Sequence, residues 1–183
     1  MARTPSTMLP LGTALPAFNL PEPRTGSAIS SDDFAGHPLV VGFVCNHCPF
    51  VVHIWDQFVA FAAEYADKGV NTVLISSNDV ESYPADSPEK MAELAHSSGA
   101  SFPYLYDESQ AVAKAFDAAC TPDFYIFDAE GMLVYRGQFD AARPGNGEPV
   151  DGADMRAALD ALLAGGVISD DQKPSMGCNI KWK

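Results

Sequence analysis

Positive charge is scarce in this sequence. Its 183 residues include 11 Lys and Arg against 24 Asp and Glu, which gives a formal net charge of -13. Because like charges repel along the whole approach to a polyanion, this balance argues against nucleic acid and anionic membranes as partners. Long apolar runs are also missing: the proline-broken segment 1–23 has no signal-peptide core, and no stretch approaches membrane-spanning length. We therefore expect no membrane partner and a cytoplasmic location.

Cysteine is rare as well, with four residues in the chain, Cys45, Cys48, Cys120 and Cys178. Four scattered cysteines exclude a disulfide-stapled scaffold, and in a reducing compartment a Cys-x-x-Cys pair is more often catalytic than structural. The hydrophobic content of 47% suffices for one well-filled core. The sequence predicts a single domain over residues 1–183, with a lead-in at 1–16 and a tail at 167–183, and it contains no repeats.

Apolar runs and helical spacing predict alternating strands and helices. Strand, helix and strand in succession, beginning with a fully apolar strand, indicate parallel pairing through a right-handed crossover. Asp107 and Gln110 have the spacing of a capping box. The expected strands are 17–20, 28–30, 39–44, 70–76, 102–106, 123–127 and 132–139, and the expected helices cover 51–68, a segment from Pro88, 107–116 and 151–164.

Two cysteines stand where the apolar strand 39–44 ends and the helix after it begins. Unpaired backbone N–H groups and the helix dipole favour an anion there, and a cysteine pKa near ~8.5 can fall to roughly 3.5–7.5 in such a setting. His47, when protonated, would act in the same direction. Because Cys45 and Cys48 can close into a small disulfide, one thiol can attack a substrate and the other can resolve the mixed disulfide.

The same pair could form half of a zinc site, which needs two further ligands. No second pair occurs at zinc-finger spacing, so the placement between strand and helix favours redox chemistry and no metal. The other candidate ligands are His37, His53, His96, Cys120 and Cys178.

These motifs together resemble the thioredoxin fold: the segment 45–48 between a strand and a helix, Thr121-Pro122 before a strand, and a hairpin containing Gly131. The resemblance implies an α/β protein with a thioredoxin-like fold, in which helices flank a central mixed β-sheet. It also implies an N-terminal hairpin extension and a C-terminal tail.

The lead-in and the tail resemble one branch of that superfamily. Phe18-Asn-Leu with Gly26, and the element 33–36, are similar to the peroxiredoxin-like branch, which includes the alkyl hydroperoxide reductase/thiol-specific antioxidant proteins. The segment 174–183 resembles the ending of a subgroup of small bacterial peroxiredoxin-like proteins. The similarity covers nearly the whole chain, and it is more specific for the fold than for the reaction.

The resemblance also implies roles for individual residues. Cys45, expected to be the more exposed thiol, attacks as a thiolate and Cys48 resolves, while Asn46 and His47 tune the pKa. Pro122 is expected to be cis and to lie against the thiol pair. The residue before it, Thr121, then presents its backbone N–H and C=O to an extended substrate.

Two further cysteines are candidates for additional redox thiols. Cys120 directly precedes Thr121 and is as readily interpreted as a small buried hydrophobe. Cys178 lies in the tail, which contains Ile180 and Trp182 and is expected to dock on the body because exposing a Trp leaves a large apolar surface in water. The spacing alone does not say whether docking brings Cys178 to the site.

Positions at which this sequence differs from the motifs of its relatives help to distinguish among the possible activities. Peroxiredoxins carry a hydroxyl residue three positions before the reactive cysteine, where this chain has Gly42, and an arginine where it has Cys120 to Pro122. Arg136 could replace that arginine only if its side chain turned inward, and a solvated strand arginine is the favoured interpretation. Thioredoxin's buried aspartate and kink proline are replaced by Leu39 and His53.

The sequence therefore favours a thiol-disulfide oxidoreductase with an antioxidant role and no cofactor. Its expected partners are disulfide-containing proteins or small molecules, and an external dithiol or a thioredoxin reductase-type protein that recycles it. The alternatives are a thiol peroxidase that uses Cys45 and a carrier of copper or zinc.

Overall fold

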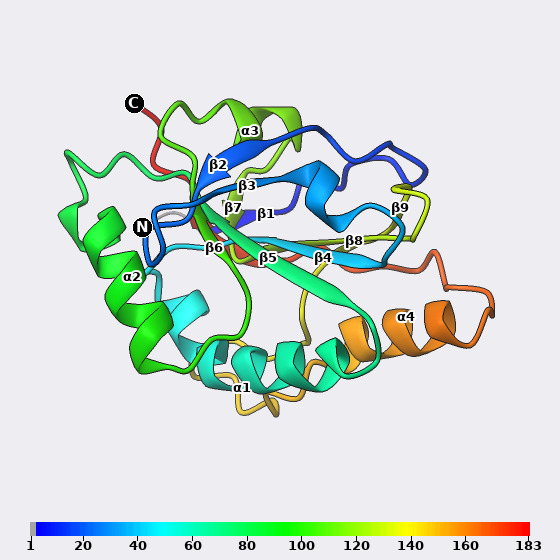
Figure 1. Ribbon diagram of the computed structural model, residues 1–183. Coiled ribbons are helices and arrows are strands. Elements are labelled where there is room, and N and C mark those ends of the chain that lie inside the picture. Colours follow the sequence, from blue (N-terminus) through cyan, green and yellow to red (C-terminus); the bar gives the residue numbers. More distant parts are fainter. Residues whose placement is uncertain (1–2) are drawn as a thin grey trace.

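The central sheet of the protein has five strands and carries the Cys-x-x-Cys segment at the end of its middle strand. The structure is a computed structural model that describes residues 3–183; Met1 and Ala2, the start of the predicted lead-in, lie outside the described residues. β5 and β6 run parallel to β4 and β8 runs antiparallel to it, as expected for a mixed sheet. The strand order is β6 (Tyr104–Tyr106), β5 (Asn71–Ser76), β4 (Leu39–Phe43), β8 (Asp123–Phe127) and β9 (Leu133–Gly137) (Figure 1).

Helices and a hairpin cover the two faces of this sheet. All five residues of β4 are buried, because apolar side chains pack against both faces. One face packs against α1 (Pro49–Ala66), α2 (Pro88–Ser97) and α4 (Ala153–Leu163). The other packs against α3 (Ala111–Ala115) and the hairpin of β2 (Asn19–Pro21) and β3 (Ala28–Ser30), while short 3-10 turns η1 (Ser31–Phe34) and η2 (Pro84–Asp86) join elements (Figure 1).

A second, three-stranded sheet joins segments from the two ends of the chain. It is antiparallel, with the order β1 (Arg3–Pro5), β10 (Met176–Asn179) and β7 (Cys120–Thr121). The sequence did not predict these strands, since β1 lies in the proline-broken lead-in and β10 in the tail. The expectation that the tail docks on the body is confirmed: Cys178 and Ile180 are buried.

Two local predictions are wrong. Asp107 and Gln110 form no capping box: the Asp107 carboxylate accepts from the backbone of Val112 and Ala113, whereas the Gln110 amide donates to the Lys181 carbonyl oxygen. The Gln110 side chain binds the tail, so it does not make the hydrogen bond to the backbone N–H of Asp107 that a capping box requires. The second wrong prediction concerns Trp182, whose expected burial was the reason given for docking. Trp182 is 43% exposed, and the buried residues that anchor the tail are Cys178 and Ile180.

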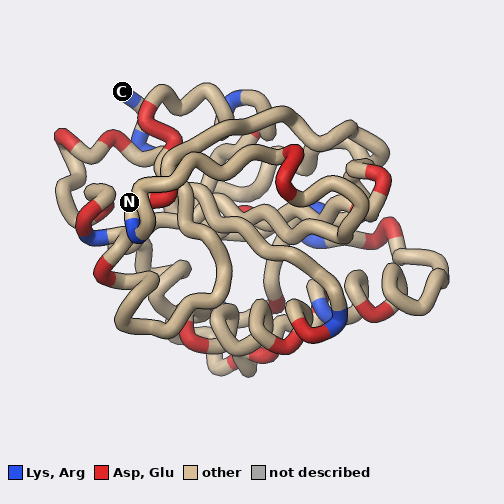
Figure 2. Tube along the Cα trace, in the orientation of Figure 1, with Lys and Arg blue, Asp and Glu red and all other residues tan. Residues whose placement is uncertain are grey.

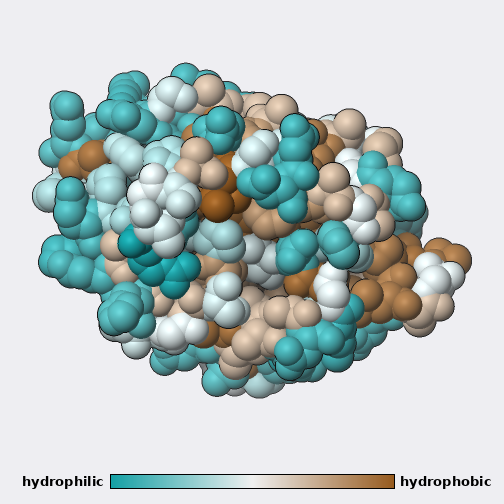
Figure 3. Space-filling model, in the orientation of Figure 1, coloured by the Kyte–Doolittle hydropathy of each residue, from teal (hydrophilic) through white to brown (hydrophobic). Residues whose placement is uncertain are grey.

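Acidic residues outnumber basic ones along the chain. Acidic residues lie along the helices that cover the lower face of the sheet in Figure 2, in keeping with the net charge of -13. Figure 3 shows apolar side chains at the projecting right edge, where the turn after α4 lies, and Val167 is 94% exposed. None of the helices in the described part of the chain is both long and apolar enough to cross a membrane.

Candidate active site

The Cys-x-x-Cys segment lies at the junction of β4 and α1, as the sequence predicts. Cys48 is the N-cap of α1 and has extended backbone angles. Pro49 follows at the first helical position, where the missing N–H costs no helix hydrogen bond. This geometry directs the positive end of an 18-residue helix at the cysteines.

Three thiols and one backbone turn converge at this point. Cys45 Sγ lies 3.6 Å from the Thr121 hydroxyl, and Cys48 Sγ lies 3.2 Å from the Thr121 carbonyl oxygen. Cys48 Sγ also lies 3.0 Å from Cys178 Sγ. The Thr121-Pro122 bond is cis, as expected. The structure thus brings together the predicted pair, the cis proline turn and one of the two additional cysteines.

Both cysteines of the pair are covered. The exposed fraction of Cys45 is 1% and that of Cys48 is 0%, so the greater exposure expected of Cys45 is negligible and neither thiol is open to solvent. The physical reason is the tail: β10 pairs with β7 beside the cluster and places Cys178 against Cys48. Any substrate must reach the pair past this cover.

The three thiols of the cluster shift one another's pKa values. A hydrogen bond to Cys48 and burial raise the pKa of Cys45, and burial and Cys48 raise the pKa of Cys178. The hydrogen bond with Cys45 lowers the pKa of Cys48 against the opposing effect of burial, whereas the Thr121 carbonyl oxygen, an acceptor, favours the protonated Cys48 thiol. The Cys45 thiolate stays a prediction.

Asp86 is a site residue that the sequence interpretation missed. Its side chain is fully buried and accepts hydrogen bonds from the backbone N–H of Asn46 (2.7 Å) and of His47 (3.2 Å) and from the Asn78 amide (2.9 Å). His47 Nδ1 lies 2.6 Å from its second oxygen. Asp86 therefore fixes the backbone between the two cysteines, and its charge contributes to the raised pKa of Cys45.

The two residues between the cysteines are held in place by aromatic partners. The Tyr104 hydroxyl donates to Asn46 Oδ1 at 3.0 Å. The His47 ring stacks on Tyr83 with centroids 5.4 Å apart, and its Nδ1 lies 3.9 Å from Cys45 Sγ. These contacts fix the positions of both residues, with Asp86 as the added partner, and their pKa-tuning role stays a prediction.

Cys120 faces away from the thiol cluster. Its Sγ contacts the Pro122 carbonyl oxygen at 3.8 Å, and burial followed by the nearby Asp123 charge raises its pKa. Neighbouring strand residues point to opposite faces, so the Thr121 hydroxyl meets Cys45 while Cys120 does not. This placement favours the interpretation of Cys120 as a small buried side chain.

The raised pKa of Asp123 predicts that the free energy of unfolding falls as the pH rises. Burial raises its pKa to about 7, despite hydrogen bonds from Ser6 and Tyr125 that lower it. The folded protein then holds a proton that the unfolded chain has released between about pH 4 and pH 7, so stability should fall as pH rises through this range. Asp123→Asn should remove on the order of 2–4 kcal/mol of that loss. Denaturant unfolding at several pH values checks this, with Glu130→Gln as an exposed control; parallel curves for Asp123→Asn and the wild type would contradict it.

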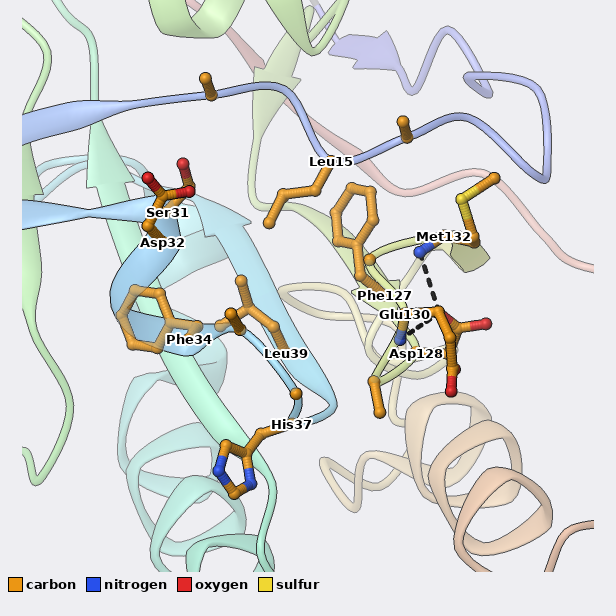
Figure 4. Close-up of a pocket in the computed structure, with 16 residues that line it drawn as sticks. Leu15, Ser31, Asp32, Phe34, His37, Leu39, Phe127, Asp128, Glu130 and Met132 are labelled. Carbon is orange, nitrogen blue, oxygen red and sulfur yellow. Dashed lines mark hydrogen bonds between the residues drawn. The ribbon is translucent and has the colours of Figure 1, made fainter.

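A cavity of about 320 Å³ lies at the other end of β4 and is separate from the thiols. Figure 4 shows Leu39, at the start of β4, facing it beside Phe34 and His37, with the turn at Asp128 on the far side. The thiols come after the end of this five-residue strand, roughly 17 Å away. None of the four cysteines lines this cavity, so its position offers no access to the redox pair.

Cys45, His47 and Asp86 have ligand atoms within 4.8 Å of one another and are candidate metal ligands. Tetrahedral zinc with N and O ligands near ~2.0 Å would separate those two atoms by roughly 3.3 Å. The observed 2.6 Å between His47 Nδ1 and Asp86 is a hydrogen-bond distance instead. The spacing fits a hydrogen bond better than a shared metal, and metal content measured by mass spectrometry on reduced protein tests the carrier alternative.

The groups that activate peroxide in relatives have no equivalents at the predicted positions. A Cβ on Gly42 would lie 2.6 Å from Leu74 Cδ2 and 2.8 Å from Phe124, so packing excludes a hydroxyl residue there. The Arg136 guanidinium donates to the Leu9 carbonyl and to Gln172. Its side chain is half-buried between those partners, away from the thiols, and is not the solvated arginine that the sequence favoured.

This sheet order, with a cis proline turn against a Cys-x-x-Cys pair, defines a thioredoxin-fold protein. The chain matches the AhpC/TSA family over residues 11–136 and belongs to that family. Its solved relatives include an uncharacterized conserved protein from Geobacillus kaustophilus, which is 53% identical with a TM-score of 0.98, over 100% of this chain and 97% of that one.

Two further comparisons bear on the chemistry and the fold. The Mycobacterium tuberculosis H37Rv protein named "Putative peroxiredoxin Rv2521" is 28% identical over 131 residues, 71% of this chain and 78% of its own length. A thiol:disulfide interchange protein from Chlorobium tepidum is 18% identical with a TM-score of 0.65, over 85% of this chain and 99% of that one, and it supports the fold alone. Family and fold together identify a thiol-based redox enzyme that acts with thiol-containing substrates and reductants.

Proposed function

We propose that this protein is a thiol-disulfide oxidoreductase in which Cys45 and Cys48 cycle between dithiol and disulfide. The observation that carries the proposal is that both thiols of the pair, at the start of α1, contact Thr121 of the cis Thr121-Pro122 turn. In a reducing cytoplasm, an external dithiol or a thioredoxin reductase-type partner would return the oxidised pair to the dithiol.

The two thiols have different roles in the proposed reaction: Cys45 attacks the substrate, and Cys48 accepts the proton that Cys45 loses. Cys45 attacks one sulfur of the substrate disulfide while Cys48, which reacts from its deprotonated form because its pKa is lowered and that of Cys45 is raised, accepts the Cys45 proton. The first leaving thiolate takes that proton from Cys48. Cys48 then attacks Cys45 Sγ, the second substrate thiolate leaves and is protonated by solvent, and a Cys45–Cys48 disulfide remains. Two electrons have passed to the substrate.

The test is the reaction of the reduced protein with oxidised glutathione. We expect the wild type to form an internal disulfide that peptide mass mapping assigns to Cys45 and Cys48. Cys48→Ser should stop at a mixed disulfide on Cys45, because the resolving thiol is gone. Cys45→Ser should release glutathione much more slowly than the wild type, because the attacking thiol is gone, and Cys120→Ser, whose thiol faces away from the cluster, is the matched control. Release at the wild-type rate by Cys45→Ser would remove this assignment.

A thiol peroxidase that uses Cys45 is the second candidate, supported by family membership and by the name of the mycobacterial relative. Against it stand Gly42 and the direction of Arg136, since preorganised donors for the peroxide oxygens are what accelerate such a reaction. Stopped-flow oxidation of the reduced protein by hydrogen peroxide separates the two candidates. A rate no greater than that of free cysteine excludes the peroxidase, whereas a much faster, Cys45-dependent rate favours it.

A further inference from the structure

We propose that Cys178 is a third redox thiol, which forms a disulfide with Cys48 as an alternative to the Cys45–Cys48 disulfide. This inference rests on the proposed function and adds a residue to it. The two sulfur atoms lie 3.0 Å apart in a buried contact that joins residues 130 positions apart in sequence. About 1 Å of movement brings them to the ~2.05 Å of a disulfide bond.

The strand register explains why this cysteine, and not Cys120, meets the pair. Cys178 lies directly opposite Thr121 in the antiparallel pairing of β10 with β7. Residues opposite each other in such a pair place their side chains on the same face. The Thr121 hydroxyl contacts Cys45 and Cys178 contacts Cys48, so this face points to the redox pair.

The tail is held at this position by contacts along its length. The Ser175 hydroxyl donates to the Pro122 carbonyl oxygen at 2.6 Å, the Ile180 N–H donates to Ala119, and the Lys181 N–H donates to Asn78 at 2.9 Å. The Asn78 amide in turn donates to Asp86. These contacts lie on both sides of Cys178, so the backbone of the tail, and not one side-chain rotamer alone, sets the position of its thiol.

β10 also lies where the sequence places a substrate. The residue before the cis proline was expected to pair with an extended substrate backbone, and in the structure that residue, Thr121, pairs with Cys178 of the protein's own tail. Cys178 therefore lies opposite Thr121, where a substrate strand was expected to pair, and against Cys48, the resolving thiol. The geometry is that of an internal disulfide exchange.

The exchange step conserves electrons and needs no outside oxidant. The Cys178 sulfur attacks Cys48 Sγ of the Cys45–Cys48 disulfide; the Cys48–Cys178 bond forms, the Cys45–Cys48 bond breaks, and Cys45 leaves as a thiolate that takes the proton lost by Cys178. One disulfide replaces another. Cys45 is thereby freed to react again while the oxidising equivalent is held by the tail.

Charge in the cluster favours the step once the first disulfide has formed. In the reduced protein burial, followed by Cys48, raises the pKa of Cys178, while Lys181 lowers it. A disulfide at Cys48 removes the contribution of Cys48, so the pKa of Cys178 falls when its target sulfur is oxidised. The third thiol is thus activated by the product of the first reaction.

The experiment isolates the two sulfurs in a Cys45→Ser/Cys120→Ser protein, which retains Cys48 and Cys178 alone among the four cysteines. Incubated with excess oxidised glutathione, acid-quenched and analysed by intact and peptide mass spectrometry, it should hold the internal Cys48–Cys178 disulfide in about tenfold or greater excess over glutathione adducts, because adjacent thiols react at high effective concentration. Persistent glutathione adducts with no internal disulfide overturn the proposal.

Matched variants distinguish this inference from the proposed function. Cys45→Ser/Cys178→Ser retains Cys48 and Cys120 and should give adducts without an internal disulfide. Cys120→Ser/Cys178→Ser retains the Cys45–Cys48 pair, and its failure to form an internal disulfide counts against the proposed function instead. Should the Cys45 variants fail to fold, peptide mapping of the oxidised wild type decides: a Cys48–Cys178 peptide supports the third thiol, and its absence across a series of glutathione redox buffers rules it out.

Discussion

Gly177→Ala is expected to destabilise the protein by roughly 3 kcal/mol or more and to expose its thiols. A Cβ at this position would lie 1.9 Å from the Thr121 carbonyl oxygen and 2.6 Å from its carbon. Those atoms belong to the backbone, so the contact is relieved only by moving β10 away from β7. Denaturant unfolding measures the stability loss, and iodoacetamide alkylation should modify Cys48 and Cys178 faster than in the wild type.

Gly166→Ala is the matched control for that substitution. Its Cβ would meet the nearest atom, the Ala161 carbonyl oxygen, at 3.5 Å, which is ordinary contact, and neither glycine has a positive φ. We expect Gly166→Ala to stay within about 0.5 kcal/mol of the wild type. If Gly177→Ala matched this control in both stability and alkylation rate, β10 would not be the element that covers the site.

Asp86→Asn is expected to change the reactivity of Cys45 more than any other substitution outside the cysteines. The carboxylate lies within 4.8 Å of the Cys45 sulfur, and its charge is one cause of the raised pKa of that thiol. Without the charge the pKa of Cys45 falls, so alkylation of Cys45 near neutral pH should be several-fold faster. The lost partner of His47 should also cost about 1–3 kcal/mol of stability.

Asp107→Asn provides the comparison, because Asp107 is also a fully buried carboxylate but binds Ser77, Val112 and Ala113 instead of the site. It should lose stability without changing the pH profile of Cys45 alkylation. That profile, measured by peptide mass spectrometry, separates a charge effect from general loosening. A profile shifted equally in both variants would remove the electrostatic role of Asp86.

Most of the fold could be predicted because its signals are local. The apolar run at 39–44, the helical spacing from Val51 and the strand at 70–76 each identify an element within a few residues of its observed bounds, β4, α1 and β5. Pro103 directly precedes β6, which lies at an edge of the sheet, where a residue without an N–H is tolerated. The redox pair and the cis proline turn followed from short motifs.

The remaining parts of the site depend on contacts between distant segments. Asp86 lies 40 positions from Asn46 and in sequence is one acidic residue of a polar loop. Cys178 meets Cys48 across 130 positions, and the short strand that carries it has no alternating apolar pattern. Neither the contact that covers Cys48 nor the contribution of Asp86 to the raised pKa of Cys45 could be derived without these partners, since both effects arise from them.

The separation of Cys48 from Cys178 also has a consequence for biosynthesis. The ribosome adds about 5–20 residues per second, so the 130 positions between them take roughly 7–26 seconds to translate. Throughout that interval the nascent polypeptide carries the Cys-x-x-Cys segment without the strand that later shields it. Newly made molecules are therefore open to glutathionylation and to cross-linking with neighbours during translation, and this vulnerability ends when the last strand is added.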